Sequence, residues 1–582
     1  MSNPVTVRVE QDVPARMRDG TVLYSDVYRP DTPGRYPVIL CRTPYDKDAF
    51  STRVDSLDPI RAARQGYAFV MQNVRGRYNS EGTFYTFKNE INDGYDSVEW
   101  AASQAWSSGA VGMHGGSYVG ATQWLAAISR PPHLKCIVPS ITSDDYYEGW
   151  TYQGGAFQLF FTLNWSLSLA LANLDHITRD HGDVSKDAGR MLEALDDLDG
   201  ALKSLNFADH PLYNNPALAP YFKDWVQHQE NDSYWRTWNI GDRHSTIEVP
   251  AYNMGGWYDV FLGGTIRNFV GMRKNGATEL ARNGQRLIIG PWFHDSSPGN
   301  VAGEMEFGAA AGSTSFDFQG TKLRWFDHWL KGEENGLDED DPVRIFVMGT
   351  NEWRSEKEWP LARTRYTDYY LHSGGRANSV RGDGSLSAEA PGDEPYDAYL
   401  YNPNNPVPTR GGGLCCYEAA YPPGSFDQRQ IEAREDVLVY STAPLESPVE
   451  VTGPVTVTLY AASSAVDTDF TAKLVDACPC GGAVNLTDGI VRARYRESTE
   501  EAKMITPGEV YEYKIDLWAT SNVFKAGHRI RLEVSSSNFP RFDRNPNTGG
   551  ELGKGTTAKP ASQTILHNGS CPSRVTLPVI PT

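Results

Sequence analysis

Ser117 stands in a glycine-rich turn whose pattern is typical of a nucleophilic serine. The segment G-G-S-Y-V-G (115–120) follows the short apolar run 110–113 and precedes the helix-forming stretch 121–128. A strand, a tight turn that carries a serine and then a helix make a nucleophile elbow, in which glycines are needed because the turn has no room for side chains. Val119 stands where the second glycine of G-x-S-x-G is expected. The pattern alone therefore leaves open an inert serine in a glycine-rich loop.

Asp259 and His294 follow Ser117 in the order that the acid and the base have in α/β-hydrolases. One strand is predicted at 249–254, followed by a loop at 255–259. A second strand is predicted at 285–289, followed by a loop at 290–294. Each candidate ends the loop after a late strand, where such an acid and such a base are needed. Two other interpretations stay open: Asp259 as the N-cap of the next helix, and His294 as a loop histidine with a structural role.

Two other histidines are weaker candidates for the base. His114 is nearer to Ser117 in the sequence, but it lies three residues back on the incoming strand, so its side chain is expected to point away from the hydroxyl. His328 lies within the predicted helix 323–330 and is expected to be a packing or surface residue. His294 is therefore the preferred candidate.

An oxyanion hole would need two hydrogen-bond donors near Ser117. One is normally the backbone N–H after the nucleophile, here that of Tyr118, and the other comes from the loop after the third strand. That strand is predicted at 36–40, and its loop 42–47 has no glycine run to supply a backbone donor. The phenolic O–H of Tyr45 stands in this loop, so Tyr45 is either the second donor or a structural tyrosine in a proline turn.

Motifs along nearly the whole chain are similar to those of one known family. They are T-P-Y-D-K (43–47), V-R-G-R-Y-x-S-E-G (74–82), G-G-S-Y-x-G (115–120), G-W-Y-D (256–259), G-P-W-x-H (290–294), N-L-T-D-G-I-V-R-A-R-Y-R (485–496) and N-F-P-R-F-D-R-N-P-N-T (538–548). On these motifs the chain resembles the cocaine esterase and X-Pro dipeptidyl-peptidase group of serine hydrolases. The resemblance implies Ser117 as nucleophile, His294 as base, Asp259 as acid, and Tyr45 with the Tyr118 N–H as the oxyanion hole.

The expected reaction is the cleavage of a carboxylic ester or amide of a small molecule through an acyl-enzyme, with no metal or organic cofactor. Trp150, Trp165 and Phe261 are candidates for an apolar acyl pocket, although core packing is the preferred interpretation for each of them taken singly. The family's use of cap tryptophans against an aromatic acyl group favours substrate contact for Trp150 and Trp165. Because relatives include esterases, β-lactam acylases and peptidases, the resemblance does not identify the substrate.

Three alternatives stay open at this point. An acylase or aminopeptidase acting on amide or Xaa-Pro bonds would need carboxylates for a substrate ammonium group, and Asp144, Asp145 and Glu148 could serve, although a solvated acidic turn is the preferred interpretation. Acyl transfer to an alcohol or amine would use the same three residues. A non-catalytic binding protein would instead use the C-terminal β-sandwich as its binding module.

Composition narrows the classes of partner. The chain has 582 residues, 40% of them hydrophobic, with 15 Trp, 30 Tyr and 22 Phe, which indicates a well-packed protein of several domains. Its formal net charge of −19 argues against nucleic acid and anionic membranes as partners. No apolar leader and no transmembrane stretch are found, so a cytoplasmic protein is expected. The oligomeric state, a homo-oligomer included, stays open.

The seven cysteines include two close pairs, Cys415-Cys416 and Cys478-Pro479-Cys480. Neither pair has the spacing of zinc ligands, and no histidine stands near either pair in the sequence. Structural or incidental cysteines, and no metal site, are therefore expected.

The pattern of periodicities divides the chain into an α/β-hydrolase core with a helical cap insertion and a C-terminal all-β jelly-roll domain. The expected ranges are 1–145 and 241–352 for the core, 146–240 for the cap and 353–582 for the jelly roll. In the cap, leucines 192, 195, 198, 202 and 205 predict one amphipathic helix. Beyond residue 353 the apolar residues alternate with polar ones, for example at 455, 457 and 459, as expected for antiparallel strands.

Overall fold

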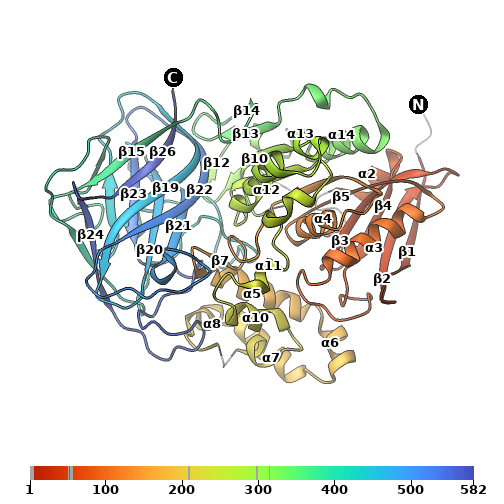
Figure 1. Cartoon of the computed structure of the whole chain (residues 1–582), viewed down its shortest axis with the longest axis horizontal. Coiled ribbons are helices and arrows are strands. Elements are labelled where there is room, and N and C mark those ends of the chain that lie inside the picture. The colour runs from red at the N-terminus through yellow and green to blue at the C-terminus, as the bar shows by residue number, and fades with distance from the viewer. Residues whose placement is uncertain are drawn as a thin grey trace.

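A computed structural model describes residues 5–49, 52, 57–207, 210–295, 299–313 and 315–581 of the chain. Figure 1 shows three regions. A large sheet flanked by helices lies on the right of the view, an all-β region lies on the left, and a group of helices lies below the large sheet.

Within the described residues, ten strands form the large sheet in the order β1-β2-β4-β3-β5-β6-β9-β10-β13-β14. The strands are β1 (Val7–Arg16), β2 (Val22–Pro30), β3 (Tyr36–Thr43), β4 (Ala68–Asn73), β5 (Ser107–Gly116), β6 (Leu134–Ser140), β9 (Tyr252–Tyr258), β10 (Arg286–Phe293), β13 (Val343–Val347) and β14 (Glu352–Glu356). The neighbouring strands from β4 to β13 pair in parallel, while β1, β2 and β14 pair antiparallel at the two edges. The carboxyl ends of the parallel strands therefore meet at one edge, where ligands bind in such sheets.

Helices cover both faces of this sheet. Helices α3 (Glu90–Ser103) and α4 (Tyr118–Ile128) bury Val98 and Trp124 in one core cluster. On the other face, α2 (Pro59–Arg64) and α14 (Phe318–Lys331) contribute to a second cluster, with Ala62 and Phe326. Helix α12 (Leu262–Asn275) follows β9 and packs against it. The α/β core expected from the sequence is confirmed.

Strands β9 and β10 are longer than the sequence predicts. Residues 255–258 and 290–293, expected to be loops, continue the two strands, which lie side by side in parallel. The glycines allow close packing and do not make a turn, because a Cβ added at Gly256 would lie 2.2 Å from the carbonyl oxygen of Trp292. Asp259 and His294 consequently come directly after the last residue of a strand.

The helical cap, defined here as α5–α11, is inserted between β6 and β9. Its helices are α5 (Leu159–Leu171), α6 (Leu174–His181), α7 (Ser185–Asp196), α8 (Leu198–Lys203), α9 (Pro211–Asn214), α10 (Pro220–Gln227) and α11 (Ser233–Arg236). The single helix predicted through residues 192–205 is wrong: it breaks at Asp197, whose carboxylate accepts a hydrogen bond from the Gly200 N–H at 3.1 Å and caps α8.

The C-terminal region is an all-β sandwich. Its strands are β15 (Arg365–His372), β16 (Ser385–Ser387), β17 (Asp397–Tyr401), β18 (Leu438–Ser441), β19 (Val449–Ser463), β20 (Asp469–Ala477), β21 (Ala483–Arg492), β22 (Tyr511–Phe524), β23 (Arg529–Ser535), β24 (Ala561–Asn568), β25 (Cys571–Pro572) and β26 (Arg574–Ile580). Alternate residues such as Val455, Val457 and Leu459 are buried in one cluster, which confirms the period of two. The domain boundaries 145, 240 and 352 stay predictions.

Short elements complete the chain. They are β7 (Tyr152–Gln153), β8 (Ala156–Phe157), β11 (Val301–Ala302), β12 (Met305–Glu306), α13 (Glu279–Asn283), α15 (Arg429–Glu432), η2 (Gly241–Thr246), η3 (Ala309–Ala311), η4 (Leu337–Glu339) and η5 (Ala493–Tyr495).

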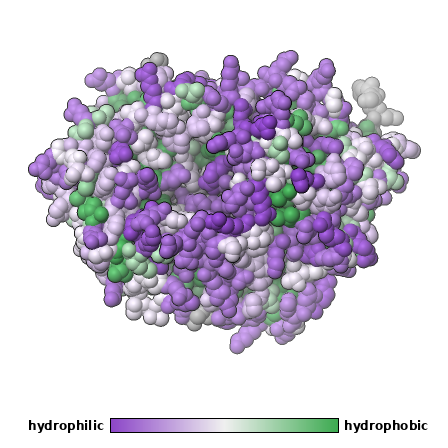
Figure 2. All heavy atoms as spheres, in the orientation of Figure 1, coloured by the Kyte–Doolittle hydropathy of each residue, from purple (hydrophilic) through white to green (hydrophobic). Residues whose placement is uncertain are grey.

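The face of the molecule drawn in Figure 2 is mainly hydrophilic, with small separate hydrophobic areas. None of the helices in the described ranges combines the length and the hydropathy that a membrane crossing requires.

Candidate active site

Ser117 occupies the corner between strand β5 and helix α4. Its backbone lies at φ 59° and ψ −126°, in a region that residues other than glycine rarely adopt. The Ser117 N–H donates to the carbonyl oxygen of Ser140 at 3.0 Å, which ties the corner to β6. A Cβ added at Gly115 would lie 2.1 Å from Cγ1 of Val119, so the valine that departs from the expected motif packs into the space above this glycine. The strained corner holds the serine side chain at the carboxyl edge of the sheet.

The three residues expected to form a triad lie within hydrogen-bond distance of one another. Nε2 of His294 is 3.0 Å from Oγ of Ser117, and Nδ1 of His294 is 2.7 Å from Oδ1 of Asp259. The N-cap of α12 is Phe261 and not Asp259, so the alternative interpretation of Asp259 as a helix cap is wrong. This geometry lets the imidazole accept the proton of the serine while the carboxylate orients the ring.

The carboxylate of Asp259 lies where it can stabilise the positive charge that would form on His294 during such a transfer. The side chain of Asp259 is fully buried, and that of His294 is 8% exposed. The second carboxylate oxygen of Asp259, Oδ2, has no hydrogen-bond partner among the described residues. Because a buried carboxylate with few partners interacts strongly with a nearby charge, Asp259 is well placed to stabilise a protonated His294.

Tyr45 lies beside the serine, as expected from the loop after β3. Its hydroxyl accepts a hydrogen bond from Nε1 of Trp165 at 3.2 Å. Burial raises the pKa of Tyr45, and hydrogen bonds with Trp165 and Ser117 offset part of this effect. The phenol therefore keeps its proton near neutral pH and can donate it in a hydrogen bond beside Ser117.

Tyr118 is the first residue of α4, where backbone N–H groups have no acceptor within the helix. Its side chain is anchored away from Ser117, because its hydroxyl donates to Oε1 of Glu90 at 3.0 Å and accepts from the Phe87 N–H at 3.0 Å. Glu90 in turn forms a buried ion pair with Arg42 at 2.6 Å. These contacts anchor the first turn of α4.

A cavity of about 430 Å³ opens at the serine, and its lining includes Tyr45, Ser117, Trp165, His294 and Cys416. Of the three residues expected to bind substrate, the cavity lining includes Trp165 but not Trp150 or Phe261.

Trp150 and Phe261 instead stack on each other, with ring centroids 4.2 Å apart at 8°. Phe261 meets the ring of His294 edge to face at 5.1 Å, and Trp150 meets Trp165 in the same way at 5.8 Å. Trp150 and Phe261 therefore pack against His294 and against Trp165 in the cavity wall, without lining the cavity themselves.

His114 and the three acidic residues near the cap do not bond to Ser117 or His294, although His114 is among the residues that line the cavity. His114 is buried against Phe69, and its two ring nitrogens have no hydrogen-bond partner among the described residues. Asp144 is buried and forms an ion pair with Arg267 at 2.8 Å. Burial raises the pKa of Asp145 to about 6 and that of Glu148 to about 7. The expectation of a solvated acidic turn is therefore wrong.

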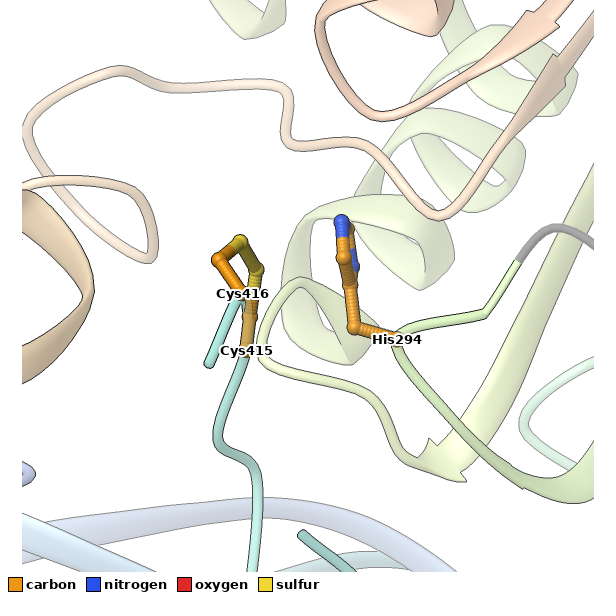
Figure 3. Close-up of side chains that lie close together, drawn as sticks. All are labelled: His294, Cys415 and Cys416. Carbon is orange, nitrogen blue, oxygen red and sulfur yellow. A yellow bond between two sulfur atoms is a disulfide. The ribbon is translucent and has the colours of Figure 1, made fainter. Parts of the chain in front are cut away.

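The fold places both cysteines of the first pair beside His294, which the sequence did not indicate. Figure 3 shows the ring of His294 next to the disulfide between Cys415 and Cys416. One ligand atom from each of the three residues lies within 4.8 Å of the other two. No histidine stands near this pair in the sequence, and the contact forms because the loop that carries Cys415, between β17 and β18 of the β-sandwich, reaches the sheet edge at His294.

The comparisons with known proteins identify the family of the chain. The family profile described as "X-Pro dipeptidyl-peptidase (S15 family)" matches residues 19–296, and the profile of its C-terminal non-catalytic domain matches residues 335–576. The chain is 42% identical over 577 residues to the cocaine esterase of Rhodococcus sp. (strain MB1 Bresler), with 98% of each chain covered.

Two solved structures are similar over the whole chain. An α-amino acid ester hydrolase has a TM-score of 0.82 at 26% identity and covers 100% of this chain and 97% of its own. An aminopeptidase from a marine sediment Thaumarchaeota archaeon has a TM-score of 0.82 at 26% identity. The match covers 99% of this chain and 97% of the aminopeptidase chain. The chain therefore belongs to the X-Pro dipeptidyl-peptidase (S15) family that includes cocaine esterase, and it is a serine ester hydrolase.

Proposed function

We propose that Ser117, His294 and Asp259 hydrolyse a carboxylic ester of a small molecule through an acyl-enzyme. Nε2 of His294 accepts the serine proton as Oγ attacks the ester carbonyl, and then delivers that proton to the leaving alcohol. Water, activated by the same nitrogen, releases the acid and restores the serine. The observation that carries the proposal is the continuous chain of hydrogen bonds from Oγ through the imidazole to Oδ1, at 3.0 and 2.7 Å.

The Tyr45 hydroxyl and the Tyr118 N–H form the proposed oxyanion hole. Both flank Ser117, one from the loop after β3 and the other from the first turn of α4. The positive N-terminal end of α4 adds to the stabilisation of the negative charge that develops on the carbonyl oxygen. The cycle in these steps uses side chains and water alone, so treatment with EDTA is expected to leave the rate unchanged.

The substrate proposed for this site has a small apolar or aromatic acyl group. A volume of about 430 Å³ suits a small molecule, and Trp165 supplies an aromatic wall to the cavity. Trp150 and Phe261 hold that wall and the base in place, which is the role we propose for them. Nucleic acid is not a proposed partner, because the formal net charge is −19. The cytoplasmic location and the oligomeric state stay predictions.

Cleavage of amides by an aminopeptidase-type reaction is the second candidate, since one similar structure is an aminopeptidase. Such a reaction needs a carboxylate free to pair with the substrate ammonium. Asp144 is instead paired with Arg267, and none of Asp144, Asp145 and Glu148 is among the residues that line the cavity at Ser117. This arrangement favours esters without an ammonium group.

Labelling with an organophosphate tests the assignment of the nucleophile. Mass spectrometry of the digested enzyme should find the adduct on Ser117, and Ser117→Ala should lose about 10³–10⁶ in kcat with an unchanged melting temperature. An adduct on another serine would remove Ser117 from the mechanism. Parallel assays with aryl esters and with the matching Xaa-Pro anilides decide between the two substrate classes.

A further inference from the structure

We propose that the reduced pair Cys415 and Cys416, together with His294, is a binding site for a soft divalent metal ion of the zinc class, and that occupation of this site switches the esterase off. The inference rests on the proposed role of His294 as the catalytic base. It goes beyond that role because it assigns a ligand and a means of control to a cysteine pair that the reaction itself does not use.

The geometry of three side chains supports the site. Their ligand atoms all lie within 4.8 Å of one another, and the ring of His294 stands next to both sulfur atoms in Figure 3. A zinc ion bound to sulfur at about 2.3 Å and to nitrogen at about 2.1 Å holds neighbouring ligand atoms roughly 3.5–4 Å apart. Once the disulfide is opened, the two cysteine side chains must rotate to separate their sulfur atoms, and all three ligand atoms start within 4.8 Å of one another.

The loop that carries the cysteines is held firmly against the active site. Leu414 and Cys415 are buried in the core cluster that also contains Phe261. A Cβ added at Gly413 would lie 3.3 Å from the carbonyl oxygen of Asp259, so the loop rests on the backbone of the triad acid. The sulfur atoms are therefore kept close to His294 by packing.

Cys416 is the accessible member of the pair. It is exposed and lines the same cavity as Ser117 and His294. Its backbone adopts φ 79°, a left-handed conformation that is uncommon for residues other than glycine. A metal ion that enters the substrate cavity can therefore reach Cys416 and His294 directly.

The hydrogen bonds of His294 already match those of a metal ligand. Its Nδ1 is engaged by Asp259 at 2.7 Å, and its Nε2, which lies 3.0 Å from Oγ of Ser117, is the nitrogen left to bind a metal ion. A histidine that donates one ring N–H to a carboxylate and binds the metal with the other nitrogen is the usual arrangement in zinc sites. Because catalysis needs the same lone pair of Nε2 to accept the serine proton, a bound metal ion and the triad exclude each other.

The oxidation state of the two cysteines controls the site. In the disulfide both sulfur atoms are bonded to each other, so they cannot act as thiolate ligands. A phosphine reductant opens the disulfide: it gives two electrons to the sulfur pair and becomes a phosphine oxide, and water supplies the oxygen and the two thiol protons. Binding of the metal ion then forms two metal–sulfur bonds and one metal–nitrogen bond and releases the two thiol protons.

Zinc inhibition of the two redox forms tests the proposal. Esterase activity is measured with and without buffered free Zn²⁺ after phosphine treatment, and again in the oxidised enzyme. In the reduced form kcat/KM should fall roughly tenfold when the free zinc concentration is about ten times the Kd of the proposed site. In the oxidised form kcat/KM should change little on addition of zinc. Equal inhibition of both forms, or none in the reduced form, would overturn the proposal.

Variants of the two cysteine pairs locate the effect. In Cys416→Ala, an exposed position, the ratio of the rates with and without zinc should return to near one. The matched control is the double variant Cys478→Ser/Cys480→Ser, which removes the other disulfide, in the β-sandwich, and should keep the inhibition. Zinc inhibition that survives Cys416→Ala, or that is lost in the control, would place the metal elsewhere.

Cobalt absorption separates this proposal from the proposed function. Co²⁺ bound to reduced enzyme should show thiolate charge-transfer bands and the intense ligand-field bands of a tetrahedral site, and Cys416→Ala should lack them. These bands do not depend on turnover. An enzyme without esterase activity that still shows them would contradict the proposed function alone, and an active esterase without them would contradict the metal site alone.

Discussion

Nε1 of Trp165 in helix α5 donates a hydrogen bond to the Tyr45 hydroxyl in the loop after β3, at 3.2 Å. The bond occupies a lone pair of the phenolic oxygen, so the hydroxyl proton must point elsewhere. Ser117 is the other hydrogen-bond partner that shifts the pKa of this phenol. We therefore expect the Tyr45 O–H to be oriented toward Ser117, where the proposed oxyanion would form.

Replacement of Tyr45 by Phe tests this orientation. The variant should lose about 10²–10³ in kcat, or about 2.7–4 kcal/mol, with KM nearly unchanged, because the bond strengthens only as charge develops on the carbonyl oxygen. Steady-state kinetics and a thermal melt on the same variant are sufficient. A stable variant with wild-type turnover would show that the second donor lies elsewhere, and a lower melting temperature with preserved kcat would indicate a structural tyrosine.

Asp259→Asn should lower kcat by about 10⁴, somewhat less than the loss of Ser117 or His294. The amide is nearly isosteric but carries no charge to stabilise a protonated His294, and it favours the wrong tautomer of the ring. Rates with a saturating aryl ester measure the loss, and an unchanged melting temperature shows that the fold is intact. A variant that keeps more than about one-tenth of the wild-type kcat would exclude Asp259 from the triad.

Replacement of a helical glycine by alanine should change the stability of the protein in opposite directions at two positions. A Cβ at Gly94 in α3 would lie 2.6 Å from Cβ of Ala126 in α4, so Gly94→Ala should push apart the two helices and destabilise the protein by roughly 1–3 kcal/mol. At Gly189 in α7 nothing lies within 4 Å of an added Cβ, and Gly189→Ala should stabilise by about 0.5–1 kcal/mol. Denaturant unfolding of both variants checks the signs, and the same sign for both would contradict the close contact of α3 and α4.

The buried carboxyl of Glu148 should make stability depend on pH. Burial raises the pKa of Glu148 to about 7 from its ordinary value of 4.5. Because the folded state holds this proton more tightly than the unfolded chain, the resulting stabilisation is complete below pH 4.5 and is lost as the pH rises through 7. Its size is on the order of 3 kcal/mol, since each unit of pKa difference corresponds to about 1.4 kcal/mol.

Glu148→Gln removes this dependence, since the amide oxygen can still accept the Gly154 N–H but cannot ionise. The fall in unfolding free energy between about pH 5 and pH 8 should be smaller in this variant than in the wild type. Glu193→Gln, at an exposed position of α7, serves as the control and should follow the wild-type curve. Identical pH dependence in all three proteins would show that Glu148 ionises freely.

The sequence by itself was sufficient for the elements whose signal is local. The glycine-flanked turn at Ser117 predicted a strand, a sharp corner and a helix, because a backbone at φ 59° between two closely packed elements requires small neighbours. Asp259 and His294 could be found because residues after parallel strands collect at one edge of the sheet. The alternation at Val455, Val457 and Leu459 predicted the β-sandwich because side chains of a strand point to opposite faces in turn.

Packing between segments far apart in the sequence decided where the strands end, which side chains line the cavity and which residues lie beside His294. Gly255 and Gly256 look like a turn in the sequence, yet they extend β9 because β10 approaches too closely for a side chain. Trp150 and Trp165 have the same residue type, yet Trp165 lines the cavity while Trp150 stacks on Phe261 outside the lining. Cys415 and Cys416 reach His294 from a loop between β17 and β18, and no local pattern of residues specifies a contact between segments so far apart in the sequence.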